Sequence, residues 1–245
     1  MVEDPDGNWG EHEGSWLSIW FGDRDMGWGY GFRCPTIDFV NAFEPGDSRY
    51  DATIVEDGES IPGIFGGAPH DFTGGSWNPP TGFMGQKYLI PDTERPVTAD
   101  CNGNLDYIFL RYADVLLMYA EASLESNGSA TQQGLDAINH VRSRARGFNI
   151  ASSETPEFPD LTLSDLTLDE IMDERLRELC IEHYRKFDLL RTNKLQDAIY
   201  TRKPTNWPYM TGPITIDNSK WLFPIPQSEI DVVVNKENLW QNPGY

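Results

Sequence analysis

Residues 110–128, LRYADVLLMYAEASLESNG, and residues 134–147, GLDAINHVRSRARG, decide the fold of this chain. In the first stretch apolar residues recur at intervals of three and four, which is typical of a helix that buries one face. In the second stretch the same spacing links Leu135, Ile138 and Val141. Because the connection between the two is short, we expect an antiparallel helical hairpin.

A third helical pattern begins at Thr167. Thr167 and Glu170 have the T-x-x-E spacing of a capping box, which marks the start of a helix. Apolar residues then continue at helical spacing as far as Leu190. The opposite face carries many charges three or four residues apart, including Glu174 and Arg177. We expect one long helix whose charges form structural ion pairs.

Composition divides the chain near Asp106. Residues 1–105 hold most of the glycines and no sustained helical periodicity, which indicates loops with a few short strands or helical turns. Residues 106–245 contain the helices and return to irregular structure after Tyr200. The expected fold class is mainly α, with a tetratricopeptide-like helical hairpin plus a long helix, extensive irregular loops and a few short strands. We expect the two regions to form one continuous domain.

The charge of the chain restricts its partners. It has 19 Lys and Arg against 39 Asp and Glu, a formal net charge of -20. Neutralising phosphates needs clustered basic residues, so the sequence argues against binding to nucleic acid, and a neutral ligand fits better. No stretch has the ~20 apolar residues that cross a bilayer, and the N-terminus lacks the basic and apolar regions of a secretion signal. Either the chain is cytosolic or its signal lies in a preceding segment.

Three separated segments resemble one family. The helical hairpin is similar to that of SusD/RagB proteins, whose pattern is close to RYAEVLLMYAEA followed by A-x-x-x-I-N-x-V-R-x-R-A. Residues 168–191, LDEIMDERLRELCIEHYRKFDLLR, resemble the pattern ERRxELAFEGxRxFDLxR. Residues 222–245 contain LFPIPQSEID and NLWQNPGY, which resemble FPIPxxEI and NPxLxQNPGY. With residues 35–54, PTIDFVNAFEPGDSRYDATI, the likeness covers residues 33–245.

The resemblance implies a function for a longer protein. It implies a non-catalytic component of an outer-membrane SusCD-type uptake complex that captures oligosaccharides for a TonB-dependent SusC-like transporter in a Bacteroidetes-type bacterium. This chain would be the C-terminal half, and a surface-exposed lipoprotein's N-terminal lipid anchor would lie in the absent half. The alternative is a peptide-binding import lid of the RagB kind, which would use strand edges and a groove rather than aromatic rings.

The residues themselves indicate no catalytic, metal or cofactor site. The four histidines have no metal-ligand spacing, and the three cysteines include no C-x-x-C pair. Glu174 and Glu178 lie one turn apart, but the carboxylates of glycosidases face each other across roughly 5 to 10 Å, whereas these alternate with arginines. We therefore expect structural ion pairs and no enzyme, with a glycoside hydrolase as the least favoured alternative. A bridge between Cys34 and Cys101 stays open.

Aromatic side chains of the loop-rich region are the candidate glycan-binding residues. A sugar ring has apolar C–H faces and polar edges, so binding needs exposed rings flanked by groups that bond hydroxyls. Loops on a rigid scaffold are where such contacts concentrate. Two sets have that mixture, the first being Trp16, Trp20, Asp23, Arg24, Asp25, Trp28 and Tyr30, and the second Trp77 with Asn78. The alternative for each ring is a place in the core.

Overall fold

The computed structural model describes residues 15–32, 34–75, 78–95, 105–146, 158–200 and 222–245. The chain divides into two compact units. The first consists of Met1–Arg185 with Pro204–Pro208, and the second of Lys186–Lys203 with Tyr209–Tyr245. Each unit is described by itself below.

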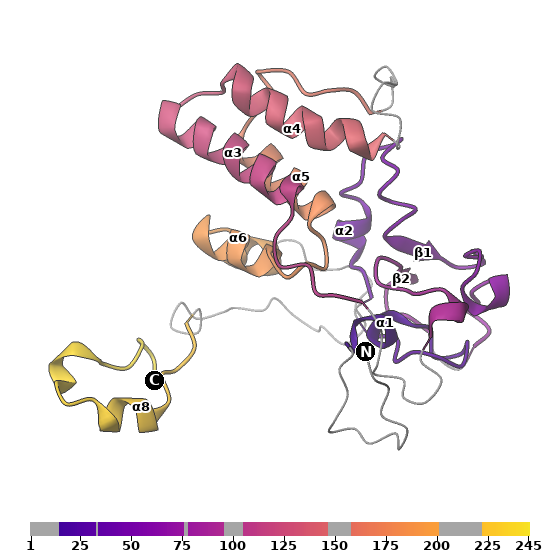
Figure 1. The fold of residues 1–245 in the computed structure, drawn as a ribbon, viewed down its shortest axis with the longest axis horizontal. Helices are drawn as coiled ribbons and strands as arrows, with labels where there is room; N and C mark the ends of the chain where they lie inside the picture. Colours follow the sequence, from indigo (N-terminus) through magenta and orange to yellow (C-terminus); the bar gives the residue numbers. More distant parts are fainter. Residues whose placement is uncertain (1–14, 33, 76–77, 96–104, 147–157, 201–221) are drawn as a thin grey trace. The chain divides into compact units, whose positions relative to one another are not determined.

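Three of the described helices in the first unit pack around one core. They are α3 (Tyr112–Asn127), α4 (Gln132–Ala145) and α5 (Leu168–Glu178). The helices α3 and α4 lie side by side as a hairpin, and α5 packs against both (Figure 1). Their shared core contains Leu117, Ala120, Leu135, Ile138, Val141, Ile171 and Met172. The predicted hairpin and the mainly α fold class are therefore confirmed.

Local sequence explains where these helices begin and end. The side chain of Thr131 accepts a hydrogen bond from the Gly134 N–H at 3.1 Å, and that of Thr167 accepts one from the Glu170 N–H at 3.2 Å. Each bond satisfies a donor of the first turn, which has no partner within the helix. Helix α3 ends at Gly128, whose φ of 65° lies in the left-handed region that glycine adopts without steric cost.

The prediction of a single helix as far as Leu190 is wrong. Helix α5 ends at Glu178, and α6 (Arg185–Arg191) begins only after a turn. Within that turn Ile181 has a φ of 67° and His183 a φ of 70°. Both are left-handed conformations that no right-handed helix contains. The apolar spacing continues across the turn, so periodicity alone could not show it.

The loop-rich region contains short elements, as expected. They are α1 (Leu17–Phe21), α2 (Ile37–Val40), β1 (Ile54–Glu56), η1 (Phe65–Gly67), β2 (Phe83–Gly85) and η2 (Asp92–Glu94). Strands β1 and β2 form an antiparallel pair in which Val55 lies opposite Met84. Both of these residues belong to a second core, which also contains Ile19, Trp28, Ile61, Ile64, Phe65, Phe72 and Ile90. The region is therefore folded around apolar side chains of its own.

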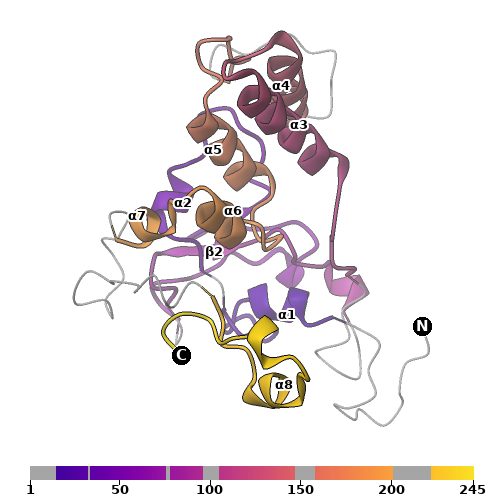
Figure 2. The same cartoon turned by 90° about the vertical axis from the view of Figure 1, so that its left-hand side faces the viewer.

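In the second unit, α6 is followed by α7 (Leu195–Tyr200), α8 (Gln227–Val232) and η4 (Lys236–Asn238), and Figure 2 shows α8 close to the C-terminus. Gln241 ties this segment together. Its side-chain amide accepts from the Ile225 N–H at 2.7 Å and donates to the Ile225 carbonyl at 2.8 Å, while Asn242 donates to the Phe223 carbonyl. The side chains of the terminal Q-N motif therefore hold the backbone of the F-P-I-P segment close to the C-terminus. Among the described helices, none has both the length and the apolar character needed to cross a bilayer.

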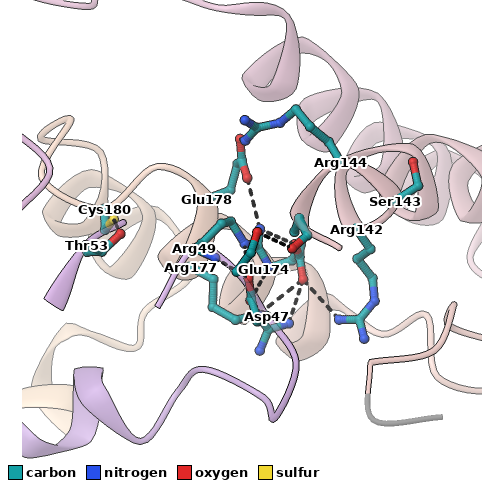
Figure 3. Close-up of polar contacts among 12 residues, drawn as sticks. Asp47, Arg49, Thr53, Arg142, Ser143, Arg144, Glu174, Arg177, Glu178 and Cys180 are labelled. Carbon is teal, nitrogen blue, oxygen red and sulfur yellow. Dashed lines mark hydrogen bonds and ion pairs between the residues drawn. The ribbon is translucent and has the colours of Figure 1, made fainter. Parts of the chain in front are cut away.

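A buried ion network joins the loop-rich region to the helices (Figure 3). Its centre is Arg49, whose Nη1 lies 2.6 Å from Glu174 Oε1 and 2.9 Å from Glu178 Oε2. The Nη2 of Arg49 lies 2.6 Å from Asp47 Oδ2, and Arg142 of α4 reaches the second oxygen of Glu174 at 3.2 Å. Glu174 is fully buried. The interpretation of the α5 charges as structural ion pairs is therefore confirmed.

The network continues at the C-terminal end of α5. Glu178 also pairs with Arg111 and Arg144, and Glu182 pairs with both Lys87 and Arg111. The ammonium group of Lys87 donates to the Cys180 carbonyl at 2.9 Å. A cation at this position satisfies a carbonyl just beyond the helix end and complements the negative end of the helix dipole.

The charge state of Glu174 should control part of the stability. Burial by itself would raise the pKa of this carboxyl, but Arg49 and Arg177 outweigh burial and lower the pKa to about 2. A carboxylate whose pKa falls on folding stabilises the native state above its unfolded pKa, and that contribution is lost as the pH falls through the folded pKa. The stability linked to Glu174 should therefore disappear progressively below about pH 4.5.

We expect Glu174→Gln to lower the free energy of unfolding at pH 7 by about 3 to 5 kcal/mol, because it leaves buried arginines uncompensated. It should also flatten the decline of that free energy between about pH 4.5 and pH 3. Urea denaturation at several pH values measures both effects. Glu125→Gln on the exposed face of α3 is the control and should change neither. An unaltered pH profile in Glu174→Gln would contradict the assignment.

The turn after α5 yields a second expectation. His183 has a φ of 70° and stands where the quoted family pattern has glycine. Since a side chain costs about 1 kcal/mol in this conformation, His183→Gly should stabilise the chain by up to about that amount. His183→Ala keeps the Cβ atom and should give no such gain. Thermal unfolding of the two variants compares them, and equal effects would show that the backbone conformation is not the cause.

Candidate functional site

Residues 22–32 form a loop held against α1 by backbone hydrogen bonds. The N–H of Tyr30 donates to the Ile19 carbonyl and that of Phe32 to the Trp20 carbonyl, each at 2.9 Å. Between them the Gly31 N–H donates to the Gly22 carbonyl, also at 2.9 Å. The positions of the loop side chains are therefore set by main-chain pairing with α1.

Two glycines permit this close crossing. A Cβ atom at Gly22 would lie 2.2 Å from the Trp28 carbonyl oxygen, and one at Gly29 would lie 1.9 Å from the Gly22 carbonyl carbon. Gly29 also has a φ of 150°, which side chains disfavour. No other residue fits at these positions without moving the backbone. The glycine-rich MGWGYGF sequence thus serves to bring the loop onto the helix.

Tyr30 and Phe32 of this loop lie near Trp16, which directly precedes α1, and we call these three rings with the neighbouring Arg24 the aromatic row. The ring centroids of Trp16 and Tyr30 are 6.3 Å apart, and those of Tyr30 and Phe32 are 5.7 Å apart. The guanidinium carbon of Arg24 lies 5.6 Å from the centroid of Phe32, and its Nε donates to the Tyr30 carbonyl. Phe32 is 50% exposed, while Trp16 and Tyr30 are half-buried.

The structure therefore brings together Trp16, Arg24 and Tyr30, three of the residues singled out from the sequence. It adds Phe32, which the sequence reasoning missed. The signal was present in W-G-Y-G-F, where aromatic residues alternate with glycines at positions 28, 30 and 32.

Trp28 lies apart from the row, in the core. Only 9% of its surface is exposed, and the Arg95 guanidinium lies 4.8 Å from its ring and 4.3 Å from the Phe65 ring. A ring covered in this way has no free face for a ligand. Trp20 is half-buried and packs against two apolar clusters, the second core and a smaller one of Leu17, Phe21 and Tyr88. Burial thus favours the core alternative for Trp28, and we leave it out of the site proposed below.

The polar cluster beside these rings is split between interior and surface. Asp23 is 1% exposed, its Oδ2 lies 2.9 Å from Nδ1 of buried His70, and its Oδ1 accepts from the Asp25 N–H at 2.9 Å. Asp23 therefore fixes the loop and does not face solvent. Asp25 is exposed, and Arg24 lies against the row.

The second predicted set is only partly described. Asn78 is exposed just before the turn in which the Gly82 N–H donates to the Pro79 carbonyl. Trp77 lies outside the described residues, as does Cys101, so a bridge to Cys34 stays untested. Burial raises the pKa of the Cys34 thiol to about 11, which keeps it protonated at neutral pH.

One group of described carboxylates has the spacing of a metal site. Glu44, Glu170 and Glu174 each offer an oxygen, and these oxygens lie within 4.8 Å of one another. However, Arg142 Nη1 lies 2.7 Å from Glu44 Oε1, and Arg177 Nη2 lies 2.6 Å from Glu170 Oε1 and 2.7 Å from Glu174 Oε2. Guanidinium groups already neutralise the three acids. We therefore assign them to the ion network.

The different placements of Trp28 and Phe32 can be tested by stability. Trp28→Ala should lower the free energy of unfolding by about 3 to 5 kcal/mol, because it leaves a cavity in the core. Phe32→Ala removes a ring that is half exposed and should cost less than about 1 kcal/mol. Urea denaturation followed by circular dichroism measures both. Similar losses in the two variants would contradict the division into core and surface rings.

Comparisons with known proteins agree with the motifs. A model of the SusD family matches residues 2–245. SusD-like protein P38 of Formosa agariphila is 36% identical over 119 residues, which are 46% of this chain and 23% of that protein. Starch-binding protein SusD of Bacteroides thetaiotaomicron is 27% identical over 154 residues, 62% of this chain and 24% of that protein.

A solved structure extends the likeness to the fold. Surface glycan-binding protein A from Bacteroides fluxus superposes with a TM-score of 0.65 at 27% identity, covering 95% of this chain and 46% of that one. This chain thus spans less than half of the solved relative, and the matched segments span about a quarter of the two curated relatives. With the family model matching residues 2–245, this chain belongs to the SusD family.

Proposed function

We propose that this chain is a glycan-binding region and that the aromatic row contacts the glycan. The observation that carries the proposal is the row itself, in which Trp16, Tyr30 and Phe32 follow one another at 6.3 and 5.7 Å. Successive sugar units present apolar faces that stack on such rings. The names of two relatives, a starch-binding protein and a surface glycan-binding protein, support a carbohydrate as the ligand.

Arg24 supplies the polar part of the proposed site. A guanidinium group carries five N–H donors in one plane, and here it lies beside the exposed ring of Phe32. A sugar stacked on Phe32 would bring its hydroxyl groups to this edge. Stacking then provides affinity, and the hydrogen bonds select the orientation.

The overall charge favours a neutral glycan. A net charge of -20 repels uronic acids and sulfated sugars, and one arginine in the row does not offset it. We further propose binding without cleavage, because the paired acids Glu174 and Glu178 are buried among arginines instead of facing each other across a cleft. Hydrolysis of any polysaccharide by the chain would overturn this part.

The setting of the site is also a proposal. We propose that residues 1–105 and 106–245 are parts of one domain in a longer protein that is tethered to the outer membrane and passes oligosaccharides to a TonB-dependent transporter. The exposed apolar side chains of Tyr112, Val115, Met118 and Tyr119 support the longer protein. They recur at three and four residues along α3, as expected for a helix face that packs against a further segment.

Replacing single rings of the row tests the proposed function. Phe32→Ala and Tyr30→Ala should each weaken binding of a neutral oligosaccharide by about 1 to 3 kcal/mol, by analogy with other aromatic stacking contacts. Isothermal titration calorimetry with starch oligosaccharides and other neutral glucans measures the loss. Phe109→Ala is the matched control, since Phe109 is 81% exposed just before α3 and should leave affinity unchanged.

The ligand panel separates the alternatives. Binding to an anionic polysaccharide in preference to neutral ones would contradict the charge argument. Selective binding of peptides, unaffected by Phe32→Ala, would favour the peptide-binding alternative. Unchanged glycan affinity in both ring variants would move the glycan site away from the row.

A further inference from the structure

The loop that follows α2 forms a surface hollow. Its volume is about 480 Å³, and it is lined by residues 43–48, 50 and 51. None of these residues belongs to the aromatic row. Pockets for small ligands generally measure about 300 to 1,000 Å³, so the hollow has room for a sugar unit.

This loop is held rigidly by its surroundings. Asp47 is bonded by Arg49, which itself reaches the buried Glu174. The backbone N–H and the hydroxyl of Ser48 both donate to the Ala145 carbonyl, at 3.0 and 2.6 Å. Loops fastened at several points keep their shape when empty, which lowers the entropic cost of binding.

Two aromatic rings line the hollow. The rings of Phe43 and Tyr50 meet edge to face, with centroids 5.8 Å apart. The ring of Phe39 also packs edge to face on Phe43, with centroids 5.2 Å apart. The Tyr50 hydroxyl donates to Glu56, which fixes the orientation of its ring. Both lining rings are half-buried, so part of each is accessible.

The polar groups of the hollow accept hydrogen bonds. Asp51 and Ser48 are exposed, while Glu44 is half-buried and bonded by Arg142. No lysine or arginine is among the lining residues. Carboxylate and hydroxyl oxygens accept from sugar hydroxyls, and their negative charge disfavours an acidic sugar.

We propose that this hollow is a second carbohydrate subsite, which takes one neutral sugar unit against Phe43 and Tyr50 with Asp51 as hydrogen-bond acceptor. The inference rests on the proposed function, since both sites would take the same class of ligand. Two sites on one rigid unit can engage one polysaccharide together, and the second contact then forms at a high effective concentration.

Nuclear magnetic resonance of the isotope-labelled chain locates binding at each site separately. Addition of a neutral glucan oligosaccharide should shift the amide signals of Gly46, Ser48 and Asp51 as well as those of the row. In Phe32→Ala the shifts of the hollow should persist. In Phe43→Ala they should require about 5- to 150-fold more ligand, the equivalent of one stacking contact.

Asp51→Ala, a surface change, provides a second test that does not touch the packing of Phe43. It should weaken the response of the hollow while leaving that of the row intact. Shifts confined to the row would overturn the second subsite and leave the proposed function standing. Shifts in the hollow that vanish in Phe32→Ala would also overturn it, because they would indicate one site. A chain that binds no glycan at either place would overturn the proposed function as well.

Discussion

The pairing of Arg49 with Glu174 and Glu178 is the constraint on which the first unit depends. The two larger apolar cores of this unit belong to different stretches of chain, one to the helices and one to the loops. Arg49 follows α2 in the loop-rich region. Its Nη1 lies 2.6 Å from a carboxylate oxygen of Glu174 and 2.9 Å from one of Glu178, both in α5. Removing these charges from water is costly, so the geometry must satisfy nearly every donor. Asp47, Arg142 and Arg177 supply the remaining partners.

The aromatic row takes no part in this ion network. Its loop is fixed by main-chain pairing with α1 and by the bond between Asp23 and His70. These contacts anchor the loop, and the ion pairs of Arg49 join the loop-rich region to α5. Surface rings on such a support lose little entropy when they bind. The loop around the hollow is anchored in a similar way, because Asp47 in that loop pairs with Arg49 of the ion network.

Sequence reasoning succeeded where structure is decided locally. Helical periodicity predicted the hairpin, and the capping box of Thr167 and Glu170 predicted the start of α5, because both signals depend on neighbours within a few residues. It failed at Ile181 and His183, since a left-handed backbone leaves the apolar spacing unchanged. For the proposed site, Trp16 and Tyr30 were singled out by residue type, but the burial of Trp28 depends on Arg95 and on the second core, most of which is distant in sequence. No property of Trp28 itself could distinguish a core ring from an exposed one.

The motifs that identify the family and the residues proposed to bind glycan do different things. Glu174 and Glu178, from the E-R-R-x-E-L pattern, and Arg142, from the V-R-x-R pattern, are buried ion partners. The side-chain amide of Gln241, in the terminal Q-N-P-G-Y, bonds both the N–H and the carbonyl of Ile225. These residues specify a scaffold, and a scaffold alone does not determine which ligand is bound. Membership of the family therefore limits the class of function, and we propose that the choice of ligand comes from loop side chains such as Phe32 and Arg24.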